Sequence, residues 1–450
     1  MIGAGDIIIV YLSFWISCFL RDIYTGPSFI YFFTEKGGLL ITIWLFSHPI
    51  PFYIFELYDE RHWQGANLIL LLCAALTASF LLLIVLLFFF EQNNMIERWF
   101  SLFFLLFAIV FLSGWRKIFK KFLLKRFYRV NKSVFIGHSA LYKKIAGTPS
   151  LNREGTSLVV LETSSENPGI LLLNGCRLQQ GLLGFVREFG SKVVVVSQDL
   201  RKNPAILKQL LELRLSGVTV YDAPYFYEAV FGKVPVETVK DSWFIFRNQG
   251  NRFNPLLYKI VKKILDNILA FLLFLAFLPA FPVICLAVKC SSKGSVFFRQ
   301  ERLGKNMKPF TLLKFRTMVQ DAEELTGPKW AEKDDPRVTA VGKILRKTRL
   351  DELPQVINVL KGEISFVGPR PIRKHFADML AKEIPHYGLR FAVKPGLTGW
   401  AQVRGDYAGS KQGQKDKLEY DLYYIQNQSV LFDLLIILKT VQTIIFRIGQ

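Results

Sequence analysis

The sequence predicts a mixed fold in three parts: a helical membrane region, a small α/β module, and a C-terminal domain that starts with a helix hairpin in the membrane. Hydrophobic residues make up 51% of the 450 residues and include 41 Phe, which is unusual for a wholly soluble chain. Apolar runs crowd the first quarter, β-rich runs occupy the middle, and a proline-broken apolar run precedes a basic C-terminal part.

Four apolar stretches in residues 1–118 predict a bundle of four transmembrane helices, because one span needs roughly 17–25 apolar residues. Trp99 and Trp115 bracket the last stretch at positions typical of the membrane interface. Pro49 and Pro51 predict a kink in the second stretch. The stretches are Ile7–Leu20, Gly38–Phe55, Ala66–Phe90 and Trp99–Trp115.

A basic run from Arg116 to Lys132 contains the linker of residues 119–131 and predicts the orientation of the helical region. Positive residues beside membrane helices stay on the cytoplasmic side. Four spans then place both ends of the region in the cytoplasm, which predicts a multi-pass membrane protein. The same residues would also suit a surface helix that binds anionic lipid headgroups.

Residues 132–245 predict a small parallel α/β module, since strand-like runs alternate with helical patterns such as Pro204–Leu215. A dinucleotide-binding Rossmann unit carries G-x-G-x-x-G after its first strand, whereas Gly137 stands alone here. We therefore predict a degenerate Rossmann-like module with a structural or regulatory role; retained nucleotide binding is the alternative. The predicted strands are Val134–Gly137, Ser157–Glu162, Gly169–Asn174, Lys192–Ser197 and Val218–Asp222.

The fifth apolar run, Ile264–Val288, predicts a re-entrant membrane helix over residues 256–290. Lysines flank both of its ends, so the positive-inside rule favours neither direction of crossing. Pro279 and Pro282 interrupt the run and remove backbone hydrogen bonds. A hairpin that dips in and returns satisfies the charges better than a straight span, which remains the alternative.

Residues 291–450 contain the candidate site. Lys314 and Arg316 follow an alternating stretch that is typical of a strand, so we expect both side chains on one side, gripping phosphate oxygens. An exposed basic strand edge is the alternative.

Asp351 and Glu352 are adjacent carboxylates, which need a metal ion or basic surroundings if both are to be ionised. Arg346 lies just upstream. One carboxylate could attack phosphorus while its neighbour holds Mg²⁺. An acidic helix N-terminus with Pro354 in its first turn is the alternative.

Two segments rich in proline and glycine complete the pattern. In Gly368–Pro371 two prolines fix the backbone around Arg370, which prepares an anion contact. In Lys394–Gly405 the glycines permit tight loops and close approach of backbone to a ligand. Each segment alone could equally be a structural turn.

These segments, in this order after a proline-broken hairpin, resemble the bacterial sugar transferases, which are polyprenyl-phosphate hexose-1-phosphate transferases. The resemblance covers about Lys259–Gln450. The N-terminal helices and the α/β module resemble, in architecture only, the large members that start exopolysaccharide or O-antigen synthesis. The matching segments are Phe297–Gly304, Lys314–Met318, Asp335–Arg337, Asp351–Gln355, Pro369–Pro371 and Gly396–Gly405.

The resemblance implies a monotopic catalytic domain on the cytoplasmic face of the bacterial inner membrane. Such enzymes move a sugar-1-phosphate from a UDP-sugar to undecaprenyl phosphate, release UMP and require Mg²⁺. Asp351 would form an aspartyl-phosphosugar intermediate, and Glu352 together with Asp351 would bind Mg²⁺. UDP-glucose or UDP-galactose is the expected donor. The residues expected to bind substrate are Lys314, Arg316, Arg337, Arg346, Arg370 and Gln355.

One departure from the family concerns the helix break. Ser-Pro is common there, whereas this chain has Leu278 before Pro279 and a further proline at Pro282. A serine hydroxyl therefore makes no contribution to the bend in this chain.

Composition limits the partners and leaves one other class of function open. The formal charge of +21 fits phosphorylated substrates and anionic lipid, and we expect no nucleic-acid partner because the basic residues follow membrane segments without a recognition motif. Five cysteines without CxxC spacing argue against zinc. A catalytically inactive scaffold for polysaccharide synthesis is the alternative function. A homodimer through the module and contacts with polysaccharide assembly proteins are compatible with the sequence.

Overall fold

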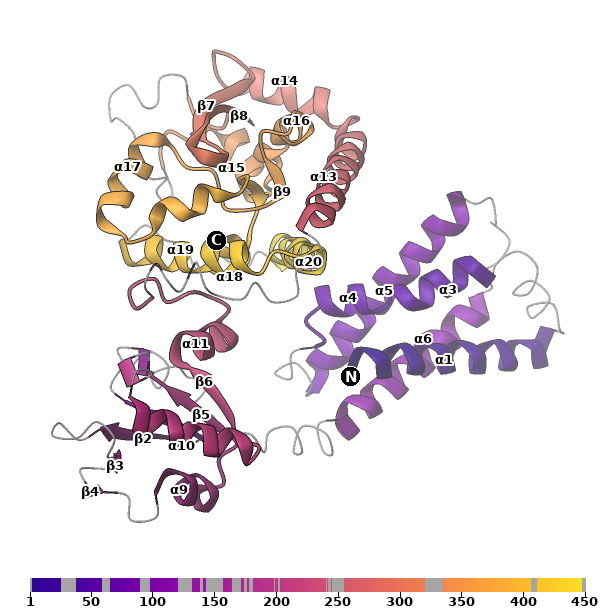
Figure 1. The fold of residues 1–450 in the computed structure, drawn as a ribbon. Coiled ribbons are helices and arrows are strands. Elements are labelled where there is room, and N and C mark those ends of the chain that lie inside the picture. Colours follow the sequence, from indigo (N-terminus) through magenta and orange to yellow (C-terminus); the bar gives the residue numbers. More distant parts are fainter. Residues whose placement is uncertain are drawn as a thin grey trace. The chain divides into compact units, whose positions relative to one another are not determined.

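The computed structural model divides the chain into two compact units, Met1–Val130 and Asn131–Gln450. Figure 1 shows the helices and strands of each unit. The structure describes residues 2–25, 38–58, 65–89, 98–119, 132–137, 141–142, 157–163, 171–173, 176–177, 181–197, 199–200, 203–239, 241, 244, 255–319, 335–405 and 411–446.

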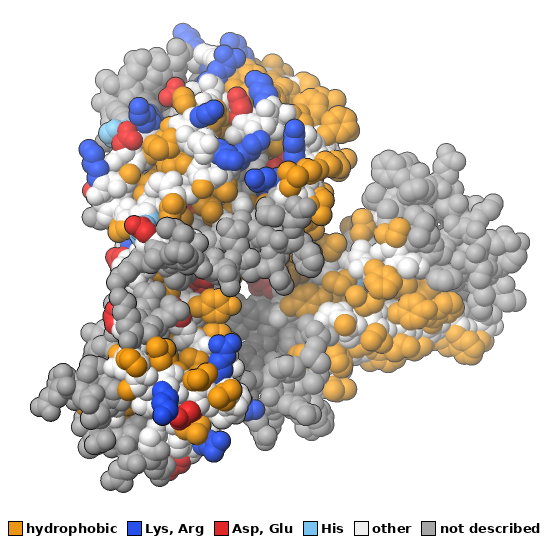
Figure 2. Space-filling view, in the orientation of Figure 1, with side chains coloured by type: hydrophobic (Ala, Val, Ile, Leu, Met, Phe, Trp, Pro, Cys, Tyr) orange, Lys and Arg blue, Asp and Glu red, His pale blue; other side chains and the backbone are white. Residues whose placement is uncertain are grey.

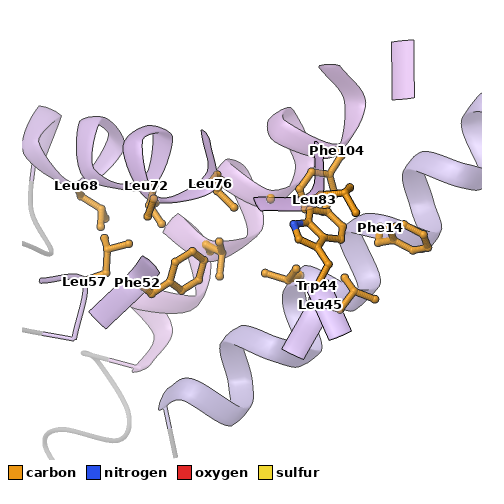
Figure 3. Packing of buried hydrophobic residues seen from close by; sticks show 14 of the residues in the cluster. Phe14, Trp44, Leu45, Phe52, Leu57, Leu68, Leu72, Leu76, Leu83 and Phe104 are labelled. Carbon is orange, nitrogen blue, oxygen red and sulfur yellow. The ribbon is translucent and has the colours of Figure 1, made fainter. Parts of the chain in front are cut away.

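The N-terminal unit consists of helices packed around an apolar core (Figure 3). Trp44 and Phe104 lie fully buried at its centre, with ring centroids 5.1 Å apart. The second predicted segment is divided into two helices at His48, as the prolines predict. The helices are α1 (Ile2–Thr25), α3 (Gly38–Ser47), α4 (Pro49–Ile54), α5 (Gly65–Phe89) and α6 (Arg98–Ile118).

The helices of this unit differ in length and composition, and therefore in whether they could cross a membrane. Within the described residues, α1 contains the single unbent helix that is long and apolar enough to cross a bilayer, over Gly3–Leu20 with a mean hydropathy of 1.8. A shorter apolar stretch, Leu68–Leu83, lies in α5. All four predicted segments are thus helical where they are described, while four membrane spans remain a prediction.

A buried ion pair joins α1 to α6. Arg116 donates from both terminal nitrogens to the carboxylate of Asp6, with Nη2 3.0 Å from Oδ2, and both side chains are fully buried. A buried charge is tolerated when such bidentate pairing compensates its desolvation. The first residue of the predicted cytoplasmic basic run is therefore a packing residue of this unit.

The α/β module contains a six-stranded sheet of order β4-β3-β2-β1-β5-β6. The four strands β2, β1, β5 and β6 are parallel, but β3 and β4 are antiparallel, so the prediction of a parallel sheet is wrong at this edge. Only residues 164–170 separate β2 from β3, which is too short for a parallel crossover. The elements are β1 (Lys132–Ile136), β2 (Ser157–Thr163), β3 (Leu171–Leu173), β4 (Cys176–Arg177), α9 (Gly181–Phe189), β5 (Val193–Val196), α10 (Pro204–Leu215), β6 (Thr219–Asp222) and α11 (Ala223–Phe231).

Gly137, which follows β1, has a packing role. Its φ of +94° favours glycine, and a Cβ atom there would lie 2.6 Å from Leu200 Cδ1. This one glycine is therefore accounted for by backbone conformation and close packing without a phosphate ligand.

The C-terminal domain begins with two helices, α13 (Pro255–Phe277) and α14 (Phe281–Ser291), bent by 68° at residues 278–280. Pro279 lies in the break, and Pro282 lies in the first turn of α14, where its missing N–H costs no helical hydrogen bond. Both helices expose large apolar side chains, among them Phe271, Leu275 and Leu286. Figure 2 shows hydrophobic side chains over this part of the domain.

The rest of the domain packs on these helices through short elements. β7 and β8 form an antiparallel hairpin, and β9 and β10 form a parallel pair. The elements are β7 (Phe297–Leu303), η6 (Lys305–Met307), β8 (Pro309–Phe315), α15 (Ala340–Lys347), η7 (Leu350–Glu352), α16 (Gln355–Leu360), β9 (Ser365–Val367), α17 (Lys374–Glu383), η8 (Tyr387–Ala392), β10 (Gly396–Thr398), α18 (Trp400–Arg404), α19 (Lys411–Gln426) and α20 (Val430–Phe446).

The α/β module is hydrogen-bonded to this domain. The Trp400 indole N–H donates to the carbonyl of Gly232 over 2.7 Å, and the backbone N–H of Val234 donates to the carbonyl of Glu419 over 3.0 Å. The Tyr227 hydroxyl also donates to the Glu419 carboxylate. These contacts fix α18 and α19 against the segment that follows α11.

Candidate active site

Asp351 and Glu352 lie in the short turn η7, directly before α16. Arg349 precedes this turn with a φ of +60°, which is uncommon for a residue other than glycine, and Pro354 occupies the N-cap position of α16. Asp351 is only 8% exposed. The adjacent carboxylates thus lie just before the N-terminus of α16. Their protonation states depend on the side chains that contact them.

Glu352 is held between two cations that come from different elements. Lys314 of β8 places Nζ 2.9 Å from Glu352 Oε1, and the Arg370 guanidinium donates to the same carboxylate. Burial raises the pKa of Glu352, but the charges and hydrogen bonds of Arg370 and Lys314 outweigh this and hold it well below its usual range. Glu352 is therefore ionised at neutral pH.

Asp351 has the opposite shift. Burial raises its pKa, and the negative charge of Glu352 adds to this, while the charges of Lys314, Arg370 and Arg346 oppose it. Two neighbouring carboxyl groups with diverging pKa values are typical of sites in which each group has a separate role.

Arg346 and Gln355 lie near the acidic pair, and Arg337 binds an aspartate on which the charge of Arg346 acts. Arg346 donates from Nε to Thr317 Oγ1 over 2.9 Å, and its charge also acts on Asp351. Arg337 binds Asp335 with Nε 2.8 Å from Oδ1, and this hydrogen bond is the main reason that the pKa of Asp335 falls to about 2. Gln355 is buried as the first residue of α16.

Arg316 points to a different part of the domain. β8 ends at Phe315, so strand alternation does not extend to Arg316, and Arg316 and Lys314 have different hydrogen-bond partners. Their shared grip on phosphate oxygens stays a prediction. Its Nη2 donates to the carbonyls of Ser292 (2.6 Å) and Val288 (3.3 Å), at the end of α14. The buried Nε and Nη1 atoms have no hydrogen-bond partner in the part of the chain that the structure describes.

Asn358 positions Lys314, and sequence reasoning missed it. Its Oδ1 accepts from the backbone N–H of Leu313 over 3.1 Å, and its Nδ2 donates to the carbonyl of Thr311 over 2.8 Å. These bonds join α16 to β8 one residue before Lys314. The partners lie more than 40 positions away in the sequence, so local spacing contains no signal for them.

Arg390 positions Arg370 and was also missed. Its guanidinium donates to the backbone carbonyl of Arg370 over 3.1 Å and pairs with the Asp421 carboxylate over 2.8 Å. Burial raises the pKa of Asp421 to about 6, although Arg390 and Lys417 oppose this. The buried Arg390 and Asp421 side chains thus hold the backbone of Arg370, whose own side chain is exposed.

Two of the predicted glycines pack closely against backbone. A Cβ atom on Gly396 would lie 2.1 Å from Gly368 N, and one on Gly399 would lie 2.2 Å from Gly368 O. Gly368 N–H donates to the carbonyl of Thr398, and Gly396 N–H donates to that of Pro369. The two segments therefore lock together and fix the backbone that carries Arg370.

A Mg²⁺ ion would find suitable ligands at the acidic pair. Mg²⁺ is usually held by one or two carboxylates together with waters and substrate phosphates. Asp351 and Glu352 meet this requirement, and Glu352 is ionised. Among the described residues no group of three or more His, Cys, Asp or Glu side chains could hold a metal. Waters and substrate phosphates would supply the other ligands of such a site.

Comparison with known proteins places this site in a family. A match to the bacterial sugar transferase family covers residues 257–447. A UDP-N-acetylgalactosamine-undecaprenyl-phosphate N-acetylgalactosaminephosphotransferase of Aeromonas hydrophila is 38% identical over 240 residues, which are 53% of this chain and 55% of that protein.

Two shorter relatives are covered over most of their length. A UDP-glucose:undecaprenyl-phosphate glucose-1-phosphate transferase of Caulobacter vibrioides is 42% identical over 186 residues, 41% of this chain and 69% of that protein. The exopolysaccharide production protein PSS of Rhizobium leguminosarum is 40% identical over 187 residues, 40% of this chain and 94% of that protein. The site residues from Lys314 to Arg370 all lie inside the matched region, and the chain belongs to the bacterial sugar transferase family.

Proposed function

We propose that this chain transfers a sugar-1-phosphate from a UDP-sugar to undecaprenyl phosphate, giving undecaprenyl-diphosphate-sugar and UMP. The observation that carries this proposal is the placement of buried Asp351 beside ionised Glu352, within reach of the charges of Lys314, Arg370 and Arg346. Such a reaction would be the first membrane step in the assembly of a surface polysaccharide.

Asp351 acts as the nucleophile in two displacements. Its carboxylate oxygen attacks the phosphorus that bears the sugar, and the bond from that phosphorus to UMP breaks, so UMP leaves with the electron pair. A phosphate oxygen of undecaprenyl phosphate then attacks the same phosphorus, and the bond to Asp351 breaks to restore the carboxylate. Each displacement needs only one substrate at the phosphorus.

The cations bind and neutralise the phosphates during both displacements. Lys314 and Arg370, already aligned by Glu352, stabilise charge on the phosphate oxygens. Together with Arg346 they also oppose the rise in the pKa of Asp351 that its burial causes. Mg²⁺ held through Glu352 and Asp351 would supply further positive charge to the diphosphate. Arg316, whose Nε and Nη1 have no partner among the described residues, completes the proposed set of substrate-binding residues together with Arg337 and Gln355.

The bent helix pair supports the proposed membrane placement. Exposed apolar side chains on α13 and α14, lysines at both ends and the 68° bend support a re-entrant hairpin whose ends are both cytoplasmic. The catalytic domain is then monotopic and lies at the surface where the cytosolic donor meets the lipid acceptor. The four helical segments of the N-terminal unit are proposed to cross the bacterial inner membrane.

The donor is proposed to be UDP-glucose or UDP-galactose. The Caulobacter relative is named for glucose, and the Aeromonas relative for N-acetylgalactosamine. UDP-N-acetylgalactosamine therefore belongs in the test alongside both proposed donors.

The test is UMP release by the purified full chain from a panel of UDP-sugars, with and without undecaprenyl phosphate and Mg²⁺. Release that depends on acceptor and metal, from one donor, is expected and would identify the sugar. Absence of UMP with every donor, from folded protein beside an active relative, would overturn the proposal in favour of a scaffold.

A further inference from the structure

A basic groove lies at the other end of α16 from Asp351. Its volume is about 870 Å³, and none of the residues that surround the acidic pair lines it. We call it the lysine groove after its six lining lysines, which are Lys259, Lys262, Lys263, Lys305, Lys361 and Lys394.

The positive charge of the lysine groove is largely uncompensated. Its one acidic lining residue, Asp266, already accepts hydrogen bonds from Ser365 Oγ (2.7 Å) and the backbone N–H of Phe366 (3.0 Å). Lys262 is also engaged, since its Nζ lies 2.8 Å from Asp433 Oδ2. The other five lysines form no ion pair within the described residues, and all five are exposed.

Separate parts of the fold bring these lysines together. Lys259 and Lys263 lie on α13, Lys361 follows α16, and Lys394 precedes β10. The turn at Gly362, with a φ of +76°, lies beside Lys394: a Cβ atom there would be 3.4 Å from Nζ. Ammonium groups confined to one concavity repel one another, and a bound anion removes that repulsion.

The surroundings of the lysine groove indicate the kind of anion. Lys259 and Lys263 directly precede the apolar run that begins at Ile264, so in the proposed placement the groove opens at the depth of lipid headgroups. Apolar side chains such as Leu360 and Leu389 share the lining. In Figure 2, blue cationic side chains border the hydrophobic area of this domain.

We propose that the lysine groove binds the phosphate of an anionic membrane lipid headgroup. The membrane source of this ligand rests on the hairpin placement given under the proposed function. Uncharged side chains of the lining, including Asn267, Gln426 and Asn427, can bond the hydroxyls of such a headgroup.

The experiment measures thermal unfolding of the full chain in a neutral detergent against increasing dihexanoyl-phosphatidylglycerol. Saturable stabilisation is expected with this lipid, and none with dihexanoyl-phosphatidylcholine or inorganic phosphate at equal concentration. Equal stabilisation by inorganic phosphate would overturn the assignment to a lipid, and no stabilisation by any of the three would overturn the site.

Two triple variants with the same change in charge locate the effect. In the groove variant the apparent Kd should rise on the order of 10- to 100-fold, and in the control it should stay unchanged. Equal affinities in the two variants would exclude the groove. The groove variant is Lys259→Gln, Lys361→Gln and Lys394→Gln, and the control, at exposed positions elsewhere in the domain, is Lys308→Gln, Lys374→Gln and Lys382→Gln.

UMP release from the same samples separates this proposal from the proposed function. Lipid binding that maps to the groove in a protein without transferase activity would leave the groove assignment intact while the function fails. Transferase activity without lipid-dependent stabilisation would overturn the groove assignment and leave the proposed function intact.

Discussion

The guanidinium of Arg390 pairs with the carboxylate of Asp421 inside the C-terminal domain, 2.8 Å apart, and both side chains are less than a tenth exposed. The same guanidinium donates to the backbone carbonyl of Arg370, whose side chain binds Glu352. A buried ion pair thus fixes the backbone of Arg370, whose exposed side chain is proposed to bind phosphate.

Arg390→Lys should lower kcat/KM by about 10- to 100-fold, because a single ammonium cannot replace the planar guanidinium at several partners. We expect kcat to fall more than KM rises, since the proposed role of Arg370 is to stabilise charge that develops in the transition state. Steady-state UMP release measures both, with Arg187→Lys, an exposed arginine of α9, as control. Unchanged kinetics in a folded Arg390→Lys protein would remove the positioning role.

Stability should depend on pH through Asp421, whose pKa burial raises to about 6. Between about pH 4 and pH 6 the folded protein then binds more protons at this residue than the unfolded chain does. The free energy of unfolding should therefore fall as pH rises through this window, by roughly 3 kcal/mol from this residue. Thermal midpoints of the wild type and Asp421→Asn, measured from pH 4.5 to 7, test this: the stability advantage of the wild type should shrink with rising pH. A constant difference would contradict the assignment.

Asp351→Asn should lower the rate of UMP release by roughly 10³-fold or more, because the amide cannot act as the nucleophile. The protein should remain folded. Circular dichroism and thermal midpoint serve as the folding controls. Ordinary turnover in this variant would exclude Asp351 as the nucleophile.

Glu352→Gln should leave residual activity. The acidic limb of its profile of kcat/KM against pH should lie at lower pH than in the wild type. The negative charge of Glu352 raises the pKa of Asp351, so removing it favours the ionised nucleophile. Profiles of kcat/KM against pH for the two proteins provide the comparison, and a limb that stays in place or moves upward would count against this coupling.

Gly396→Ala should prevent the C-terminal domain from folding normally, because the added Cβ would lie 2.1 Å from Gly368 N. Gly388→Ala is the matched control, since a Cβ there meets no atom within 4 Å. We expect more than about 3 kcal/mol of destabilisation for the first and less than about 1 kcal/mol for the second. Expression yield and thermal midpoint report the difference, and equal stability of the two would contradict the backbone packing.

Single cysteines at positions 252 and 292, in a chain whose native cysteines are replaced, should both react with an impermeant thiol reagent from the cytoplasmic side only. Position 292 follows α14, while Arg252 lies outside the described residues before α13. Labelling from opposite sides would convert the hairpin to a span and remove the proposed membrane placement.

Sequence patterns that reflect interactions between nearby residues predicted much of the fold. The predicted helix Pro204–Leu215 matches α10, which Asn203 caps by accepting from two backbone N–H groups. Five predicted strands of the module correspond to β1, β2, β3, β5 and β6, and the break at Pro279 is where the two helices bend. Proline, capping and alternation act within a few residues, so the sequence displays them directly.

Long-range partners were not predictable in this way. The partners of Arg316, the carbonyls of Val288 and Ser292, were not predicted, because they lie 28 and 24 positions away in the sequence. Asn358 and Arg390 act through residues 20 to 47 positions away, which only the folded domain brings together. Of the candidate site, the acidic pair and its two contacting cations were predicted, but their supports were not.

The bend at Leu278–Ala280 has a consequence for the lipids around it. Neither arm is long enough in apolar residues to cross a bilayer, since the stretches 264–277 and 281–288 extend roughly 20 and 12 Å against a hydrocarbon thickness of about 30 Å. In the proposed placement both arms occupy the inner leaflet alone. That leaflet must spread to admit them while the outer one does not, so each molecule imposes an area difference that favours local curvature of the membrane.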